Sequence, residues 1–261
     1  MQAKNHTRRI FLKKAGLAGI SAVAAPHLPL ISVEKELMGK RKEDNLIILF
    51  QGDSITDGNR GRNNDPNHIM GHGYAFSIAS RTGARFPEKK LTFYNRGISG
   101  NTISDLLARW QKDALQIKPD VLSILVGVND TNFALKQKDT EATAKFRDNY
   151  TKLLQQTKEQ LPNCMLVLCE PFIAPVGRVK EQWSNWQTEM RKKQEVVQSL
   201  ANEYNTVYVP LQNVFDKAAL RASADYWVWD GIHPTVAGHE LITQEWLKQV
   251  SKQLPFLKNL L

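Results

Sequence analysis

The chain has 261 residues, of which 42% are hydrophobic and 23% are charged, a composition that suits one globular domain of moderate size and excludes a fibrous or disordered protein. Its formal net charge is +9, but residues 1–25 carry five basic residues and no acidic one, so the remainder carries only +4. No stripe of Lys and Arg interleaved with aromatic residues stands out, so we expect no nucleic-acid partner.

The N-terminus carries a targeting pattern. It reads Thr7-Arg8-Arg9-Ile10-Phe11-Leu12-Lys13-Lys14, which resembles a twin-arginine export signal. A short stretch of small and apolar residues follows, and Ala22-Val23-Ala24 suits signal peptidase. We therefore expect residues 1–25 to be a signal peptide that engages the twin-arginine export machinery and signal peptidase.

Residues 26–45 are rich in charge and are predicted to be a linker, so the mature protein would be periplasmic or secreted. The apolar stretch is too short for a permanent membrane span, and we expect no stable membrane insertion of the mature chain. The alternative is a basic amphipathic helix that stays attached.

Strands and helices alternate along the rest of the sequence. The apolar runs predict buried strands at 46–50, 91–95, 121–126, 165–168 and 206–209. Amphipathic stretches predict helices at about 73–86, 102–117, 139–160, 183–204 and 235–252. This alternation is typical of parallel βαβ units in a doubly wound sheet.

The two cysteines, Cys164 and Cys169, lie in one strand-like run. Their offset of five places them on opposite faces of a strand, where a disulfide is geometrically poor, so we expect two buried thiols. No Cys/His spacing indicates a metal site, and the sequence predicts neither a metal nor an organic cofactor.

Four short strings, far apart in the sequence, carry the polar residues of a hydrolytic site. They are Gly52-Asp53-Ser54-Ile55, Gly97-Ile98-Ser99-Gly100-Asn101, Gly127-Val128-Asn129-Asp130 and Asp230-Gly231-Ile232-His233-Pro234. Ser54, Gly100 and Asn129 each follow a predicted strand, and parallel sheets bind ligands at the carboxyl ends of their strands. The strings supply the parts for acyl transfer through a covalent serine intermediate.

In this order the four strings resemble the SGNH, or GDSL, hydrolase superfamily, and the resemblance runs from about residue 46 to residue 252. It implies an α/β fold: a single three-layer α/β/α domain of flavodoxin-like type, with a five-stranded, doubly wound parallel sheet. Residues 46–261 would then be the catalytic domain. The resemblance also implies an oxyanion hole made by the backbone N–H groups of Ser54 and Gly100 and the side-chain amide of Asn129.

The predicted catalytic residues are Ser54 as nucleophile, His233 as general base and Asp230 as the partner of His233 Nδ1. Each has a plainer alternative. A serine after a strand also caps helices, and an isolated histidine is usually structural. His68 and His72, in the loop after Ser54, are the rival histidines.

The oxyanion candidates have plainer alternatives too. Gly100 and Asn129 also suit turns, since both residue types tolerate left-handed backbone. Asp130 is expected to brace its loop rather than react.

Aromatic and polar residues near these strings suit sugar rings, which present C–H faces and hydroxyl edges. The predicted substrate-binding residues are Asp53, Asn63, His68, Trp227 and Trp229. The strings Asp-Pro-Asn-His at 65–68 and Gly-His-Gly-Tyr at 71–74 also resemble the exported bacterial branch of the superfamily that deacetylates polysaccharides. We therefore expect a serine esterase for short-chain, chiefly acetyl, esters of carbohydrate.

Two alternatives remain open at this point. One is a lysophospholipase-like or general short-chain esterase. The other is a non-catalytic carbohydrate-binding protein on a hydrolase fold, which hydrolysis of an aryl acetate would exclude.

Overall fold

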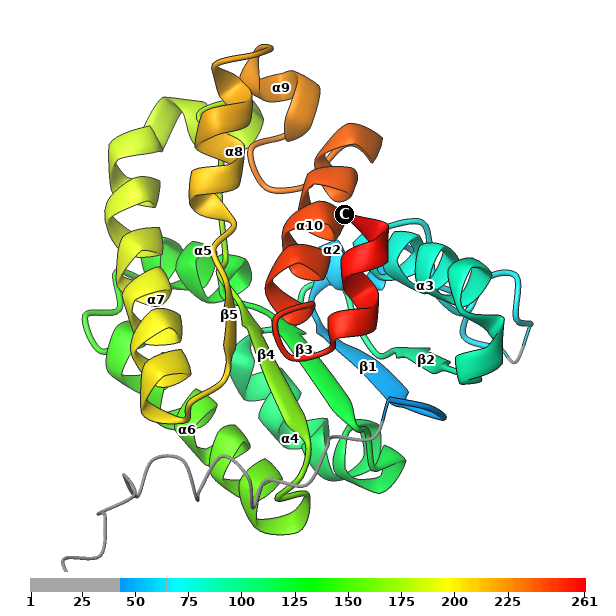
Figure 1. The fold of residues 1–261 in the computed structure, drawn as a ribbon. Helices are drawn as coiled ribbons and strands as arrows, with labels where there is room; N and C mark the ends of the chain where they lie inside the picture. The colour runs from blue at the N-terminus through cyan, green and yellow to red at the C-terminus, as the bar shows by residue number, and fades with distance from the viewer. Residues whose placement is uncertain (1–42, 64) are drawn as a thin grey trace, which may run out of the picture. The chain divides into compact units, whose positions relative to one another are not determined.

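The computed structural model describes residues 43–63 and 65–261, so the predicted signal peptide and most of the predicted linker lie outside the described residues. The described residues form a five-stranded, all-parallel sheet in the order β2-β1-β3-β4-β5 (Figure 1). The strands are β1 (Ile47–Gly52), β2 (Thr92–Asn95), β3 (Val121–Leu125), β4 (Met165–Cys169) and β5 (Val207–Val209). The expected fold class is confirmed.

Helices cover both faces of the sheet. The longer ones are α3 (Tyr74–Arg85), α4 (Ile103–Asp113), α5 (Val128–Gln137), α6 (Ala142–Gln160), α7 (Trp183–Glu203) and α10 (Val236–Val250). The shorter ones are α2 (Ser54–Asp57), α8 (Gln212–Ala219) and α9 (Ala224–Trp227). Short 3₁₀ turns are η1 (Pro87–Lys89), η2 (Leu115–Ile117), η3 (Gly177–Gln182) and η4 (Pro255–Leu260).

The core divides into two hydrophobic clusters, one on each face. On one face β1 packs Ile48 and Phe50 against α3 and α10, and on the other it packs Leu49 against α4 and α6. Figure 1 shows α3 and α10 in front of the sheet and α4 and α6 behind it. Because both faces are covered, the strands are continuous apolar runs, as the sequence indicated.

The carboxyl ends of the strands align in one row. Gly52 of β1 pairs with Leu125 of β3, Leu125 with Cys169 of β4, and Cys169 with Val209 of β5. The loops that follow these residues therefore meet at one edge of the sheet. The first three strings identified in the sequence lie at or just after the carboxyl ends of β1, β2 and β3, and the fourth precedes α10.

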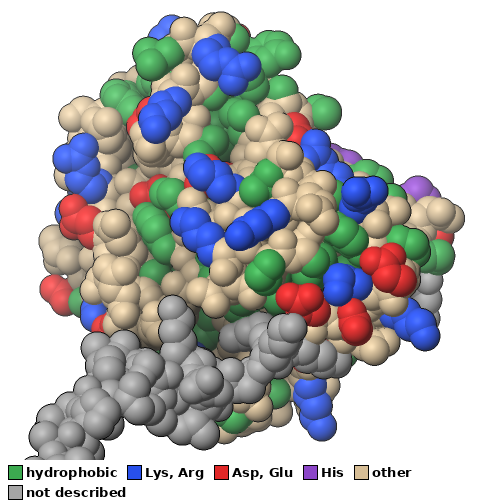
Figure 2. All heavy atoms as spheres, viewed as in Figure 1, with side chains coloured by type: hydrophobic (Ala, Val, Ile, Leu, Met, Phe, Trp, Pro, Cys, Tyr) green, Lys and Arg blue, Asp and Glu red, His purple; other side chains and the backbone are tan. Residues whose placement is uncertain are grey.

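Cys164 and Cys169 are both buried, and they belong to the clusters on opposite faces, as expected. Within 43–63 and 65–261, no helix is long and apolar enough to cross a bilayer. In that same part of the chain, no group of three or more His, Cys, Asp or Glu side chains is placed to hold a metal. Lys and Arg side chains are spread over the face drawn in Figure 2, with Asp and Glu side chains among them.

Candidate active site

Ser54 is the first residue of α2, directly after β1. A β-carbon on Gly52 would lie 2.3 Å from the Leu125 carbonyl oxygen, so only glycine lets the strand end this close to β3. Asp53 caps α2, because its Oδ1 accepts a hydrogen bond from the Ile55 N–H at 3.0 Å. This tight turn holds the half-buried Ser54 at the carboxyl edge of the sheet.

His233 brings its imidazole to Ser54 from the segment between α9 and α10. Its Nε2 lies 2.8 Å from Ser54 Oγ, and its Nδ1 lies 2.8 Å from Asp230 Oδ2. Because a carboxylate only accepts, the proton sits on Nδ1 and leaves Nε2 free to accept from the serine hydroxyl. The structure thus brings together the three residues predicted from the sequence, and we call them the candidate triad.

Asp230 is fixed by both of its oxygens. Oδ1 accepts from the backbone N–H groups of Ile232 (3.0 Å) and His233 (2.7 Å). Burial alone would raise the pKa of Asp230, but the hydrogen bonds from His233 and Ile232 hold that pKa well below the ordinary value. Asp230 is therefore an anion throughout the neutral range.

The sequence analysis missed a second donor to the same carboxylate. Arg178, in the 3₁₀ turn η3 of the connection after β4, donates from Nη2 to Asp230 Oδ2, the oxygen that also faces His233. Two backbone hydrogen bonds join this connection to the segment 230–233, which carries Asp230 and His233. They run from Arg178 N–H to Asp230 O (3.1 Å) and from Ala174 N–H to Gly231 O (3.0 Å). Nothing in the local sequence marks Arg178, because the contact exists only once β4 and α10 have packed.

Two glycines make this attachment possible. Gly177 and Gly231 both have left-handed backbone, with φ of +53° and +89°. A β-carbon on Gly177 would lie 2.5 Å from the Asp230 backbone, and one on Gly231 would lie 2.5 Å from the Val176 carbonyl oxygen. The two loops therefore interlock at a distance that side chains would prevent.

The candidate oxyanion donors lie in the loops after β2 and β3. Gly100 has φ of +86°, and no described atom lies within 4 Å of where its β-carbon would be, so it is needed for its backbone conformation and not for close packing. Asn129 lies in the first turn of α5, and its Nδ2 donates to the Asn101 carbonyl at 3.0 Å. That bond uses one amide hydrogen and leaves the second for a ligand.

Two carboxylates adjoin these donors in the sequence, the buried Asp53 before Ser54 and the half-buried Asp130 after Asn129. Burial raises the pKa of Asp53 to about 7 and that of Asp130 also to about 7. Asp130 accepts from the Ile103 N–H at the start of α4, at 3.2 and 3.3 Å, so it braces its loop as expected. The prediction that Asp53 binds substrate is wrong, because its side chain is buried and caps α2.

The family follows from comparison with known proteins. A model of the GDSL-like lipase/acylhydrolase family matches residues 50–241. The chain belongs to this family. It is a GDSL-family carboxylic ester hydrolase and is similar to acetylxylan esterases.

Several members of the family are similar over nearly their whole length. An acetylxylan esterase from Geobacillus stearothermophilus is 31% identical over 215 residues, 78% of this chain and 93% of that protein. A crystal structure of an acetylxylan esterase from that organism superposes with a TM-score of 0.70 at 29% identity, covering 80% of this chain and 96% of the other. The crystal structure of a Parabacteroides merdae protein described as a GDSL-like lipase superposes with a TM-score of 0.77 at 38% identity, covering 81% of this chain and 98% of the other.

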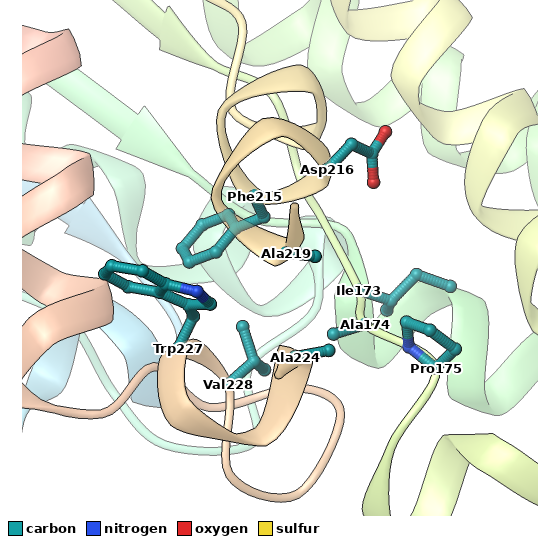
Figure 3. Close-up of a pocket in the computed structure, with 9 residues that line it drawn as sticks. All are labelled: Ile173, Ala174, Pro175, Phe215, Asp216, Ala219, Ala224, Trp227 and Val228. Atoms are coloured by element: carbon teal, nitrogen blue, oxygen red, sulfur yellow. The ribbon is translucent and has the colours of Figure 1, made fainter. Parts of the chain in front are cut away.

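The aromatic residues near this GDSL-family site divide into rim and core. Trp229 is 61% exposed, and its ring stacks against the His233 ring with centroids 6.4 Å apart. The prediction that Trp227 lies on the rim is wrong, since its side chain is only 8% exposed. Figure 3 shows Trp227 beside Phe215 and Val228, in a cavity of about 20 Å³ that is smaller than a sugar ring.

The predicted loop residues Asn63 and His68 are both exposed, and their polar contacts stay within their own loop. Asn63 Oδ1 accepts from the Asp65 N–H at 3.1 Å, and His68 Nε2 lies 3.6 Å from Asp65 Oδ2. The rival histidine His72 is exposed too. His233 is the histidine that faces Ser54.

Proposed function

We propose that the protein hydrolyses short-chain esters, acetyl esters above all, carried on carbohydrate, through an acyl-enzyme formed on Ser54. The observation that carries the proposal is the alignment of Ser54 Oγ, His233 and Asp230 through two contacts of 2.8 Å. Similarity to an acetylxylan esterase across 93% of that protein supports the acetyl and carbohydrate parts.

The reaction begins with proton transfer. His233 Nε2 takes the proton of the Ser54 hydroxyl as Oγ attacks the ester carbonyl carbon, and Asp230 stabilises the resulting imidazolium. The imidazolium then gives this proton to the departing sugar hydroxyl. In the second half, a water molecule loses a proton to Nε2 and attacks the acyl-enzyme. The acyl carbon–Oγ bond then breaks, Nε2 returns the proton to Oγ, and the acid leaves with Ser54 and His233 restored.

Each half passes through a tetrahedral oxyanion that needs fixed donors. The Ser54 N–H has no acceptor within α2, because the first N–H groups of a helix lack intrahelical partners. A β-carbon on Gly100 would meet no described atom within 4 Å, so its backbone is open to a ligand on that side, and Asn129 has one amide hydrogen to spare. These three groups are suited to receive charge that appears only in the transition state.

Trp229 supports a carbohydrate substrate. Its exposed ring lies next to the proposed base, where a sugar carrying the scissile ester would have to approach. An aromatic face there can stack on the C–H face of that sugar.

Two assays test this proposal. Wild type should hydrolyse an aryl acetate, prefer acetate to longer acyl chains, and release acetate from acetylated xylan. Ser54→Ala should abolish hydrolysis without loss of fold, because a half-buried hydroxyl contributes little to stability. Full activity of Ser54→Ala would overturn the nucleophile, and preference for lysophospholipid over acetylated xylan would overturn the substrate class.

We also propose export of the folded protein, on the strength of the Arg8-Arg9 pair and the apolar stretch after it. Replacing both arginines by lysine should trap the precursor in the cytoplasm. Unchanged export of that variant would overturn the route.

A further inference from the structure

Asp57, the last residue of α2, is the most densely bonded carboxylate near the candidate triad. Its side chain is buried and, among the described residues, accepts five hydrogen bonds. Oδ1 accepts from Arg60 N–H (3.2 Å) and Arg62 Nη1 (3.0 Å). Oδ2 accepts from Arg62 Nη2 (2.7 Å) and from both the N–H and the hydroxyl of Ser99, each at 3.0 Å.

These donors keep Asp57 charged. Burial by itself would raise the pKa of Asp57, but the hydrogen bonds from Arg62 and Ser99 lower it below the ordinary value. Hydrogen bonds to an ionised acceptor are about twice as strong as neutral ones. The charged Asp57 carboxylate therefore binds its donors strongly.

Among these donors is Ser99, which belongs to the segment that carries the candidate oxyanion donor Gly100. Ser99 immediately precedes Gly100, and both of its donors point at one oxygen of Asp57. The rest of this segment, residues 97–101, is docked on α2 as well. A β-carbon on Gly97 would lie 2.3 Å from the Asp57 backbone nitrogen, and Arg60 Nε donates to the Gly97 carbonyl at 2.9 Å.

Asn95, at the end of β2, completes the attachment. Its Oδ1 accepts from the Gly97 N–H at 2.9 Å, while its Nδ2 donates to the carbonyl of Thr56 in α2 at 2.7 Å. The helix that begins with Ser54 and the segment that presents Gly100 are thus bonded into one unit. Asp57 extends this attachment to Ser99, the residue immediately before Gly100.

We propose that Asp57 is a positioning residue for ester hydrolysis: by holding Ser99, it fixes the Gly100 N–H at the distance from Ser54 that the oxyanion requires. This inference rests on the proposed function. The competing explanation is that Asp57 only ties the loop after α2 through Arg62. That explanation predicts lower stability and unchanged chemistry per folded molecule.

The test compares two carboxylates with similar donors. Asp57→Asn removes the anchor, whereas Glu240→Gln removes a carboxylate that also accepts from an arginine and a serine hydroxyl, Arg81 (2.6 Å) and Ser77 (3.2 Å), between α3 and α10. On an aryl acetate, Asp57→Asn should lower kcat roughly 10- to 100-fold with KM changed less than about 2-fold, because the lost contact matters only in the transition state. Glu240→Gln should stay within about 2-fold of wild type.

Binding of a boronic acid gives a second readout, because its adduct with the serine mimics the tetrahedral intermediate. Its affinity should fall by the same factor as kcat/KM in Asp57→Asn. If Asp57→Asn folds poorly, Ser99→Ala decides, because it removes only the hydroxyl contact. It should lower kcat a few-fold, roughly 2- to 10-fold, at unchanged KM.

The outcomes separate the two proposals. One outcome would overturn the role of Asp57 and leave the proposed function intact: Asp57→Asn or Ser99→Ala has the same kcat per folded molecule as Glu240→Gln, while Ser54→Ala is inactive. A rise in KM at unchanged kcat would do the same. An active Ser54→Ala enzyme would overturn the proposed function and this inference with it.

Discussion

Asp230→Asn should be far more damaging than the loss of one charge suggests, because the structure dictates how the new amide must sit. The Oδ1 position accepts two backbone N–H groups, at 2.7 and 3.0 Å, so the amide oxygen has to occupy it. The amide NH₂ group is then forced into the Oδ2 position, facing His233 Nδ1 and the guanidinium of Arg178.

That arrangement reverses the imidazole. An NH₂ group can only donate, so Nδ1 has to become the acceptor and the proton moves to Nε2, where it faces Ser54. A histidine protonated on Nε2 cannot take the serine proton. An Asp-to-Asn change that reverses the tautomer in a Ser-His-Asp set costs about 10⁴-fold in kcat, roughly 5 kcal/mol. Arg178 also loses its acceptor, so the loop after β4 should loosen.

The assay is kcat and KM on an aryl acetate, with the histidine tautomer followed by ¹⁵N NMR. Asp139→Asn is the matched control, since that carboxylate pairs with Lys145 at 2.8 Å at the start of α6, away from the triad. The control should keep wild-type kcat. If Asp230→Asn kept a tenth or more of the activity, or if the Nδ1–H tautomer persisted, the assigned role of Asp230 would have to be abandoned.

Three further predictions concern other residues. Asn129→Ala should lower kcat by about 100- to 1,000-fold and change KM far less, and steady-state kinetics that showed only a raised KM would contradict it. Trp229→Ala should weaken turnover of acetylated xylan and spare an aryl acetate, as kinetics on both substrates would show. Trp227→Ala should instead lower the free energy of unfolding by about 3–5 kcal/mol, as for a buried aromatic, and calorimetry would show a lower melting temperature. Because the pKa of Asp53 is raised to about 7, ionisation of its carboxyl group should destabilise the wild type as pH rises from about 4 to 7. Asp53→Asn removes this effect, so its gain in the free energy of unfolding should be larger at pH 8 than at pH 4, by a few kcal/mol, as measured by denaturant titration.

Most of the sheet could be predicted from sequence, because strands buried on both faces are continuous apolar runs. Helix α5 was missed, since its first residues, Val128-Asn129-Asp130, were interpreted as a loop, and short helices α8 and α9 carry too few residues for a clear period. The candidate triad was predictable because Ser54, Asp230 and His233 lie in short strings that together supply the parts of one reaction, although each residue alone has a plainer role.

The contacts that orient those residues were not predictable. Arg178 and Asp230 are 52 positions apart and meet only through packing of two loops. Trp227 and Trp229 are two positions apart and have similar neighbours in sequence. Trp227 ends α9 and faces the core, while Trp229 lies in the next segment, and composition gives no sign of that difference.

Ser54 and His233 are 179 positions apart, so esterase activity requires that the last part of the chain has docked on the first. A chain that ends before residue 230 would contain the whole sheet and the serine, yet it would lack the base. Recovery of esterase activity after dilution from denaturant would therefore report the docking of the last segment, and comparison with the return of helical circular dichroism would time that step relative to helix formation. Esterase activity thus measures the fraction of chains in which the segment that carries His233 lies beside Ser54.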